Sequence, residues 1–263
     1  MKIEVGNTQL NVEDRGSGSV LLLIHGFPLN LEMWRPQIED LSNHKRVIAV
    51  DLRGHGHSPP TPGSYSMDVL ADDCAAVLAA LRVEDPVTVC GLSMGGYVSF
   101  ALFRRHPQLI SALILSATRP GSDSDLAKAN REKAIAETKQ HGSQPVLDKM
   151  LKILLAPDTY ESKPELVKNL AEIIALTSTK GILSALAGMK DRSDSTMLLG
   201  QFNIPTLIIH GAQDQIITLN ESESMASGVK NSRLEIIPAA GHLPNLEQPE
   251  MFNSIVSGFL ASI

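Results

Sequence analysis

The sequence predicts an α/β fold in which a mostly parallel, eight-stranded sheet carries helices on both faces and has a helical block inserted late in the strand series. Three observations predict this: apolar runs recur along the chain, helical patterns separate most of them, and one long segment has no strand-like run. Strands that alternate with helices favour a parallel sheet covered on both sides. The chain has 263 residues, 43% of them hydrophobic, which is enough for one large core.

The strands are predicted from their apolar pattern. The first two are short segments joined by a turn at Gly6-Asn7. The other six are predominantly apolar runs, as strands buried on both faces of a sheet should be. In chain order the predicted strands span Lys2–Val5, Gln9–Glu13, Val20–Ile24, Val47–Val50, Val87–Cys90, Ala112–Leu115, Thr206–Ile209 and Leu234–Ile237.

Helical patterns lie between most of these strands. Ser66 can cap one of the helices, with Asp68 in its first turn, and Pro249 stands where another can begin. The helices of the core are predicted over Leu31–Leu41, Ser66–Leu81, Met94–Arg105 and Glu250–Leu260.

The segment from Gly121 to about Gly200 breaks the alternation, because it contains helical patterns separated by glycine and proline and no strand. The strand series resumes after it, so we expect a lid and not an independent domain. The predicted division is core over residues 1–120, helical lid over 121–200 and core again over 201–263. The helices of the block are predicted over Asp125–Gln140, Val146–Leu155, Glu165–Leu176, Lys180–Met189 and Ser195–Leu199.

The charge of the chain indicates which kinds of partner it does not bind. The formal net charge is −6 and the isoelectric point is about 5.7, with no basic run. We therefore expect binding to neither nucleic acid nor a membrane. No signal-peptide pattern and no apolar stretch of roughly 18–20 residues is present, so a cytoplasmic protein, monomer or homodimer, is expected. Cys74 and Cys90 are expected to be buried, reduced thiols.

A serine flanked by glycines follows the predicted strand Val87–Cys90. The sequence Gly91-Leu92-Ser93-Met94-Gly95-Gly96 leads directly into a predicted helix. Such a nucleophile elbow lifts the serine hydroxyl above the sheet, at a helix N-terminus that favours negative charge, and its glycines let strand and helix approach closely. The motif alone arises by chance in about one chain of this length in ten, so its position between strand and helix carries the prediction that Ser93 is a nucleophile.

A serine nucleophile needs a base, and this elbow is followed along the chain by an acid and then a histidine. Of the four histidines after Ser93, His242 lies in a loop directly after the last strand and is the predicted base. His106 ends the elbow helix about 19 Å along its axis, and His141 lies in the helical block. His210, at a strand tip, remains the second choice.

The acid that orients His242 is predicted to be Asp214. It follows the strand Thr206–Ile209, at the sheet edge where ligands bind in open α/β folds. The rival position, after the preceding strand, has no acid. A solvated loop acid or helix cap is the alternative for Asp214.

Two backbone N–H groups are predicted to hold the oxyanion of the reaction. One belongs to Met94, directly after the nucleophile, and the other to Phe27, in the loop His25-Gly26-Phe27-Pro28. His25 is expected to support this loop. Trp34 and Tyr97 are interpreted as packing residues.

The loop from Asp51 to Ser58 contains His55 and His57, but spaced histidines without a further ligand are weak evidence for metal. We expect a rigid, hydrogen-bonded loop and no metal site.

Together these motifs resemble the α/β-hydrolase fold family over essentially the whole chain. The resemblance implies an esterase or lactonase: related haloalkane dehalogenases and epoxide hydrolases have Asp at the position of Ser93, and the Gly-Gly-Gly loop of tertiary-alcohol esterases is replaced here by His25-Gly26-Phe27. What remains is similar to carboxylesterases, 3-oxoadipate enol-lactonases and cofactor-free arylesterase/perhydrolases. No metal or organic cofactor is implied.

The expected activity is hydrolysis of a carboxylic ester or lactone through an acyl-enzyme. A small to medium, mostly apolar substrate is expected, because no cluster of arginine or lysine stands out that could hold a carboxylate of the substrate. The predicted pocket residues are Phe27, Leu147, Met150, Leu154, Leu183 and Leu243. Two alternatives stay open: a perhydrolase or acyltransferase, in which another nucleophile intercepts the acyl-enzyme, and a ligand sensor that retains the triad with slow turnover.

Overall fold

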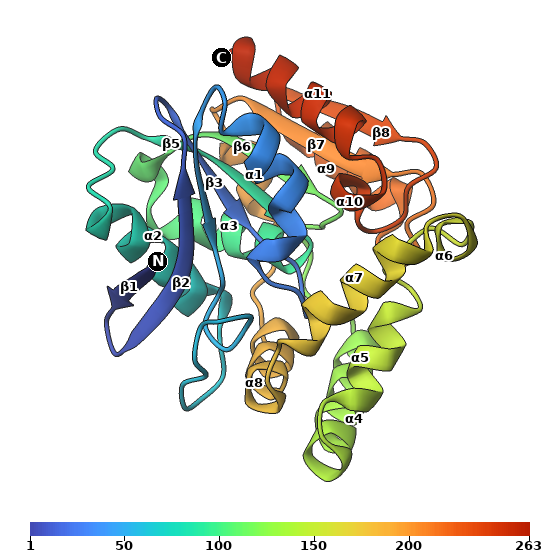
Figure 1. The fold of residues 1–263 in the computed structure, drawn as a ribbon. Helices are drawn as coiled ribbons and strands as arrows, with labels where there is room; N and C mark the ends of the chain where they lie inside the picture. Colours follow the sequence, from blue (N-terminus) through green and yellow to red (C-terminus); the bar gives the residue numbers. More distant parts are fainter.

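The computed structural model describes residues 1–263, and its eight strands form one sheet (Figure 1). They are β1 (Lys2–Val5), β2 (Thr8–Arg15), β3 (Val20–Ile24), β4 (Arg46–Val50), β5 (Val87–Leu92), β6 (Ile110–Ser116), β7 (Thr206–Gly211) and β8 (Ser232–Ile237). Their order in space is β1-β2-β4-β3-β5-β6-β7-β8. β2 pairs antiparallel with both β1 and β4, and all other pairs are parallel, so the predicted mostly parallel sheet is confirmed.

Helices cover both faces of the sheet, as predicted. On one face α1 (Arg35–Leu41) packs against α11 (Pro249–Ala261), and on the other α2 (Met67–Ala80) packs against α3 (Met94–Arg105) (Figure 1). α9 (Leu219–Gly228) lies against β7 and β8, and the short α10 (Pro244–Glu247) leads into α11. The 3-10 turn η2 (Pro107–Leu109) joins α3 to β6.

The helix ends follow local sequence signals. The Ser66 hydroxyl accepts the Val69 N–H at 3.2 Å and so caps α2, as predicted. The single helix predicted over Leu31–Leu41 is instead a 3-10 turn, η1 (Leu31–Trp34), followed by α1. Pro36 stands in the first turn of α1, where its missing N–H costs no hydrogen bond; inside a longer helix it would interrupt the ladder.

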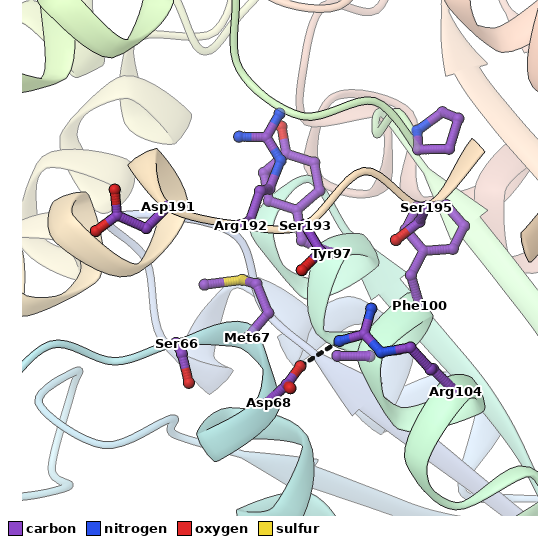
Figure 2. Close-up of a pocket in the computed structure, with 12 residues that line it drawn as sticks. Ser66, Met67, Asp68, Tyr97, Phe100, Arg104, Asp191, Arg192, Ser193 and Ser195 are labelled. Carbon is purple, nitrogen blue, oxygen red and sulfur yellow. Dashed lines mark hydrogen bonds and ion pairs between the residues drawn. The ribbon is translucent and has the colours of Figure 1, made fainter. Parts of the chain in front are cut away.

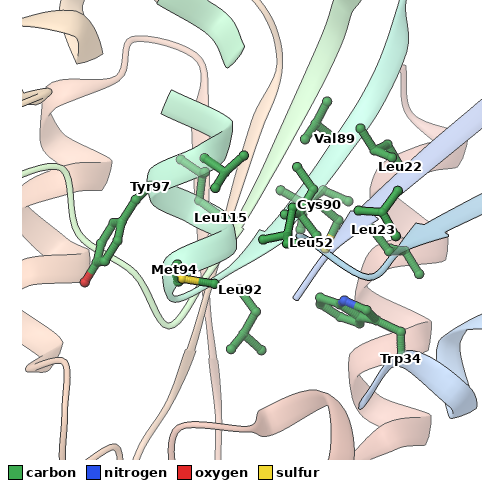
Figure 3. Close-up of a cluster of buried hydrophobic side chains, with 14 of the residues drawn as sticks. Leu22, Leu23, Trp34, Leu52, Val89, Cys90, Leu92, Met94, Tyr97 and Leu115 are labelled. Atoms are coloured by element: carbon green, nitrogen blue, oxygen red, sulfur yellow. The ribbon is translucent and has the colours of Figure 1, made fainter. Parts of the chain in front are cut away.

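The central strands make the core. Every residue of β5 is buried, and Figure 3 shows Cys90 and Leu92 of this strand beside Leu22 and Leu23 of β3, with Met94 of α3 close by. Cys74 and Cys90 are both free and buried, and burial raises the pKa of each thiol far above its ordinary value. Neither cysteine is therefore a reactive thiolate.

Between β6 and β7 the chain is helical. This segment contains α4 (Asp125–His141), α5 (Gln144–Leu151), α6 (Thr159–Ser162), α7 (Pro164–Ala175), α8 (Thr179–Lys190) and the 3-10 helix η3 (Thr196–Gln201). The prediction missed α6, because four residues carry no periodicity. It also extended α5 to Leu155, whereas the carbonyls of Leu154 and Leu155 accept hydrogen bonds from His242 and Gln215 instead of continuing the helix.

A helix that spans a membrane must be both long enough and apolar enough. No single helix meets both requirements, and α7 and α8 meet them only as a pair bent by 90°.

The carboxyl ends of the parallel strands meet at one edge of the sheet. Ile24 of β3 is in register with Gly91 of β5, and Leu92 of β5 is in register with Ser116 of β6. The residues that follow these strands are therefore neighbours, although they are far apart in the sequence. Ligands bind at this edge in open α/β sheets.

Two buried histidines support the loops that follow β3 and β4. The Nδ1 atom of His25 lies 2.8 Å from the Gly26 carbonyl, and its Nε2 accepts the Leu52 N–H at 3.0 Å, which fixes a neutral ring with the proton on Nδ1. The ring of His55 lies 5.0 Å from that of His25, centroid to centroid. The structural role expected of His25 is confirmed.

Burial keeps both rings uncharged. It lowers the pKa of His25 to about 4 and, with the added effect of the neighbouring His25, lowers the pKa of His55 to about 3. The unfolded chain would take up these two protons near the ordinary value of 6.5. The unfolded state therefore binds more protons between about pH 4 and 6.5, so stability rises with pH across this window and is lost as the pH falls through it.

We predict that acidification from pH 7 to pH 5 lowers the free energy of unfolding less in His55→Gln than in the wild type, because the amide does not titrate. Each histidine contributes a slope of about 1.4 kcal/mol per pH unit within the window. Urea denaturation at pH 7, 6 and 5 measures the slope. His44→Gln, at an exposed position, should retain the wild-type slope. If the free energy of unfolding fell equally with pH in the wild type and in His55→Gln, the prediction would be contradicted.

Candidate active site

Ser93 occupies a strained turn between β5 and α3. Its φ of 55° and ψ of −111° place a non-glycine residue at positive φ. The turn requires glycines nearby: a Cβ on Gly95 would collide with the Ile24 carbonyl, and one on Gly91 would collide with the Gly95 carbonyl. The close approach of β5, α3 and the end of β3 therefore explains the glycines of the motif.

Contacts from the neighbouring strand β6 fix the same turn. The Ser93 N–H donates to the Ser116 carbonyl at 2.9 Å, and the Thr118 hydroxyl donates to the Ser93 carbonyl at 2.8 Å. Ser93 lines a cavity of about 510 Å³, so this hydrogen-bonded turn forms part of the wall of an open space.

His242 and Asp214 meet across the loops after β8 and β7. The Nδ1 of His242 lies 2.9 Å from Oδ2 of Asp214, and both side chains are almost completely buried. The His242 ring also lines the cavity, together with Ser93. No hydrogen bond joins the Ser93 hydroxyl to His242 in this conformation; such contacts often tighten only once substrate binds.

Asp214 is held as an anion by its surroundings. Burial alone would raise the pKa of its carboxyl, but the His242 ring and the N–H groups of Ile216 and Ile217 outweigh burial and hold the pKa below its usual value. Those two N–H groups donate to Oδ1 at 2.8 and 3.1 Å, which leaves Oδ2 for His242. A fixed carboxylate at Nδ1 leaves Nε2 as the free basic atom of the ring.

The other three histidines after Ser93 do not line the cavity. His210 bonds the Ser222 hydroxyl at 3.0 Å, His106 bonds Asp72 at 2.8 Å at the end of α3, and His141 lies on the surface at the end of α4. His242 alone combines an acid partner with access to Ser93.

Two backbone N–H groups near Ser93 are free to donate. Met94 is the first residue of α3, so no carbonyl one turn earlier in the helix receives its N–H. The Phe27 N–H donates to no acceptor within the protein. Around Phe27, Leu29 N–H donates to the Gly26 carbonyl at 2.9 Å and His25 holds the loop against Leu52.

The loop after β4 is rigid, as expected. The Asp51 carboxylate is buried and accepts the N–H groups of Leu31 and His57 at 2.7 and 2.8 Å. Arg53 binds Asp73 through two hydrogen bonds of 2.6 and 2.5 Å. Nowhere in the chain do three or more His, Cys, Asp or Glu side chains gather closely enough to hold a metal ion.

The pocket prediction is partly wrong. Phe27 and Met150 line the cavity, but Leu147, Leu154, Leu183 and Leu243 do not. Leu147, Leu154 and Leu243 are buried in the main core, because their side chains fill the junction between the helical segment and the sheet. On α8 the lining residues are Leu186 and Met189, and Leu183 lies about 90° around the helix from their midpoint.

The expectation that no arginine or lysine cluster faces the site is also wrong. The cavity wall contains four cationic and two anionic side chains: Arg119, Arg131, Lys133, Lys149, Asp123 and Glu137. Half of the 20 lining residues are hydrophobic, so the charges stand within an otherwise apolar wall. These residues come from the loop after β6, from α4 and from α5, and only the fold brings them together.

Asp123 organises the arginines of this wall. Its buried carboxylate is bonded by Arg119 at 3.3 Å, by Arg192 at 2.6 Å and by Arg131. Burial alone would raise the pKa of Asp123, but Arg131 and Arg192 outweigh it and lower the pKa. Three guanidinium groups bind this carboxylate, Arg119 also donates to Glu221 at 2.8 Å, and the Nη2 of Arg131 has no protein acceptor.

Tyr97, interpreted from the sequence as a packing residue, separates two cavities. It lines the cavity that contains Ser93 and also a smaller one of about 90 Å³ (Figure 2). The guanidinium of Arg192 lies 4.1 Å from the centroid of its ring. In the smaller cavity Arg104 pairs with Asp68. The position of Tyr97, one helical turn after Ser93, was the signal that could have placed it near the site.

Comparison with known proteins agrees with this architecture. A family model described as alpha/beta hydrolase fold matches residues 19–249. The 3-oxoadipate enol-lactonase 2 of Acinetobacter baylyi is 30% identical over 241 residues, covering 91% of this chain and 88% of that protein. A thermophilic esterase from Thermogutta terrifontis, solved with malate bound, has a TM-score of 0.96 at 37% identity and covers 100% of this chain and 98% of its own.

The enol-lactonase from Burkholderia xenovorans LB400 has a TM-score of 0.92 at 26% identity, covering 99% of this chain and 100% of its own. The strand order of the sheet and the match to the family model over residues 19–249 agree with each other. The chain belongs to the alpha/beta hydrolase fold family, as a carboxylic ester hydrolase of the esterase and lactonase type.

Proposed function

We propose that this enzyme cleaves a carboxylic ester or lactone through an acyl-enzyme on Ser93, with His242 as general base and Asp214 as the residue that orients it. The observation that carries the proposal is the 2.9 Å contact between His242 Nδ1 and Asp214, made by a ring that shares one cavity wall with Ser93. A buried anion on one ring nitrogen and an accessible serine near the other form the arrangement that activates a hydroxyl.

The steps follow from this arrangement. His242 Nε2 takes the Ser93 proton as Oγ attacks the carbonyl carbon, and the N–H groups of Phe27 and Met94 stabilise the oxyanion. The tetrahedral intermediate collapses, the bond to the alcohol oxygen breaks, and His242 returns the proton to that oxygen. Water, deprotonated by His242, then attacks the acyl carbon, and Ser93 regains its proton as the acid leaves. With a lactone, the alcohol remains tethered to the acyl group.

We assign residues 121–200 the role of a lid over the core formed by residues 1–120 and 201–263. Three helices of the segment supply cavity walls: Ala127 from α4, Met150 from α5, and Leu186 and Met189 from α8. The core supplies the reacting groups, and the inserted helices determine the size and charge of the substrate.

We predict that Ser93→Ala lowers kcat by about 10⁴- to 10⁶-fold and Asp214→Asn by about 10⁴-fold, because the nucleophile or the correct tautomer of the base is lost. Hydrolysis of p-nitrophenyl esters from acetate to decanoate measures this. A fluorophosphonate should add to Ser93 in the wild type only, as mass spectrometry of peptides can locate. Ser257→Ala, on the exposed side of α11, is the matched control and should be fully active.

Full activity in Ser93→Ala would overturn the proposal. Very slow turnover by the wild type, with Ser93 still labelled, would favour the ligand sensor. Diversion of the acyl group to added peroxide or alcohol would favour the perhydrolase or acyltransferase.

We further propose that the substrate carries a carboxylate in addition to the reacting ester. The protein is acidic overall, yet cationic side chains outnumber anionic ones on the cavity wall, and the Nη2 of Arg131 is unpaired within the protein. The related esterase from Thermogutta terrifontis was solved with malate, a carboxylate, bound. An arginine in a partly apolar wall is a strong binder of carboxylates.

We predict that Arg131→Gln lowers kcat/KM for p-nitrophenyl hemisuccinate by about 10- to 100-fold, because one charge-assisted hydrogen bond is lost. Its effect on the neutral p-nitrophenyl butyrate should be less than about threefold. Lys128→Gln is the matched control: Lys128 lies on the same helix but is exposed and does not line the cavity, so its charge is screened by water. Equal losses on both esters in Arg131→Gln would exclude the carboxylate.

A further inference from the structure

The Glu247 carboxylate is completely buried where the helical insertion meets the His242 loop. Its Oε1 accepts the Gly241 N–H at 2.7 Å. Its Oε2 accepts the Ala156 N–H and the Thr159 hydroxyl, each at 2.7 Å. One carboxylate therefore joins Gly241, the residue before His242, to Ala156 and to Thr159 at the start of α6.

The same junction is held by further backbone contacts. The His242 N–H donates to the Leu154 carbonyl at 3.1 Å, and the Gln215 side chain, next to Asp214, donates to the Leu155 carbonyl at 3.1 Å. A Cβ on Gly241 would collide with the Ala156 N–H, so the two segments touch backbone to backbone. Both loops that carry the acid and the base are thus attached to residues 154–156.

The position requires a carboxylate. Three donors converge on two oxygens with no water-exposed surface, and a glutamine would direct its own N–H₂ group at one of these donors. Burial raises the pKa of Glu247, while the donated hydrogen bonds from Ala156, Thr159 and Gly241 oppose that rise. The side chain lies outside the substrate cavity and touches no reacting group.

We propose that Glu247 is a positioning residue for His242: it fixes Gly241, and through it the imidazole that faces Asp214, and it makes residues 154–159 of the insertion move with the catalytic loops as one body. This inference rests on the proposed function of His242. Because a displacement of about 1 Å in a catalytic group can reduce the rate about 100-fold, a bond to the adjacent residue is sufficient to affect turnover.

The test compares Glu247→Gln with two threonine variants. Glu247→Gln should lower kcat by about 10- to 100-fold and change KM by less than about threefold. Thr159→Val removes one donor and leaves the Gly241 bond, so it should cause a smaller loss of kcat. Thr138→Val is the matched control, since the buried hydroxyl of Thr138 has no hydrogen-bond partner, and it should keep the wild-type kcat.

Two readouts separate positioning from mere stabilisation. In Glu247→Gln the acidic limb of the kcat/KM profile should shift to lower pH, because an imidazole displaced from Asp214 is less stabilised in its protonated form. The downfield proton resonance of the His242–Asp214 hydrogen bond, recorded without substrate, should weaken or broaden. An unchanged kcat, pH profile and resonance, with only a lower free energy of unfolding, would overturn the inference.

These outcomes are distinct from failure of the proposed function. If Ser93→Ala were fully active, hydrolysis would have to occur elsewhere, yet the proton resonance would still report whether Glu247 positions His242. If Thr159→Val and Thr138→Val altered kcat equally, coupling through Glu247 would be excluded even where Glu247→Gln did not fold.

Discussion

Close packing of backbone against backbone around the end of β5 holds Ser93 at positive φ. β5, α3 and the end of β3 approach so closely that no side chain fits at Gly91 or Gly95. The parallel register then sets the remaining distances, because the loops after β3, β7 and β8 begin from strands whose spacing is fixed by hydrogen bonds. The geometry of Phe27, Asp214 and His242 relative to Ser93 is a consequence of that packing.

The sheet, the elbow and the Asp214–His242 pair could be predicted because each leaves a local signal. Gly-x-Ser-x-Gly, an acid after one buried strand and a glycine-histidine pair after the next are all contained within a few residues. The cavity wall left no such signal. Arg192, which binds Asp123 behind this wall, reaches it only after the helices between the two residues have folded, and no pattern in either segment marks the encounter.

The leucines that were wrongly predicted to line the pocket show a second limit of sequence analysis. Leu147 and Leu154 carry the apolar character expected of a pocket, but side chains of the same character are needed to attach the inserted helices to the sheet. The residue type alone does not distinguish a leucine that lines the pocket from one that packs in the core. The direction of each side chain in the folded protein decides which it is. Glu247 was missed because α10 is a four-residue helix, and one acid within it has the sequence pattern of a surface residue.

The distribution of charge differs sharply between the surface and the site. The chain is acidic, yet cationic side chains outnumber anionic ones on its cavity wall, and two of them, Arg119 and Arg131, bind the buried Asp123 carboxylate. In a partly apolar enclosure such charges interact more strongly than they would in water, because the surroundings screen them less. Asp123 and Glu221 keep Arg119, Arg131 and Arg192 in place, and these two carboxylates do not cancel the charge of three guanidinium groups.

The side chain of Tyr97 lines two chambers of very different size. Behind it lies the smaller chamber, bordered by Arg104 and Arg192, and in front lies the one that contains Ser93. A smaller side chain at this position would enlarge the space at the border of both chambers. Position 97 is therefore where protein engineers could widen the chamber that contains Ser93 from the helix α3 while leaving the sheet sequence unchanged.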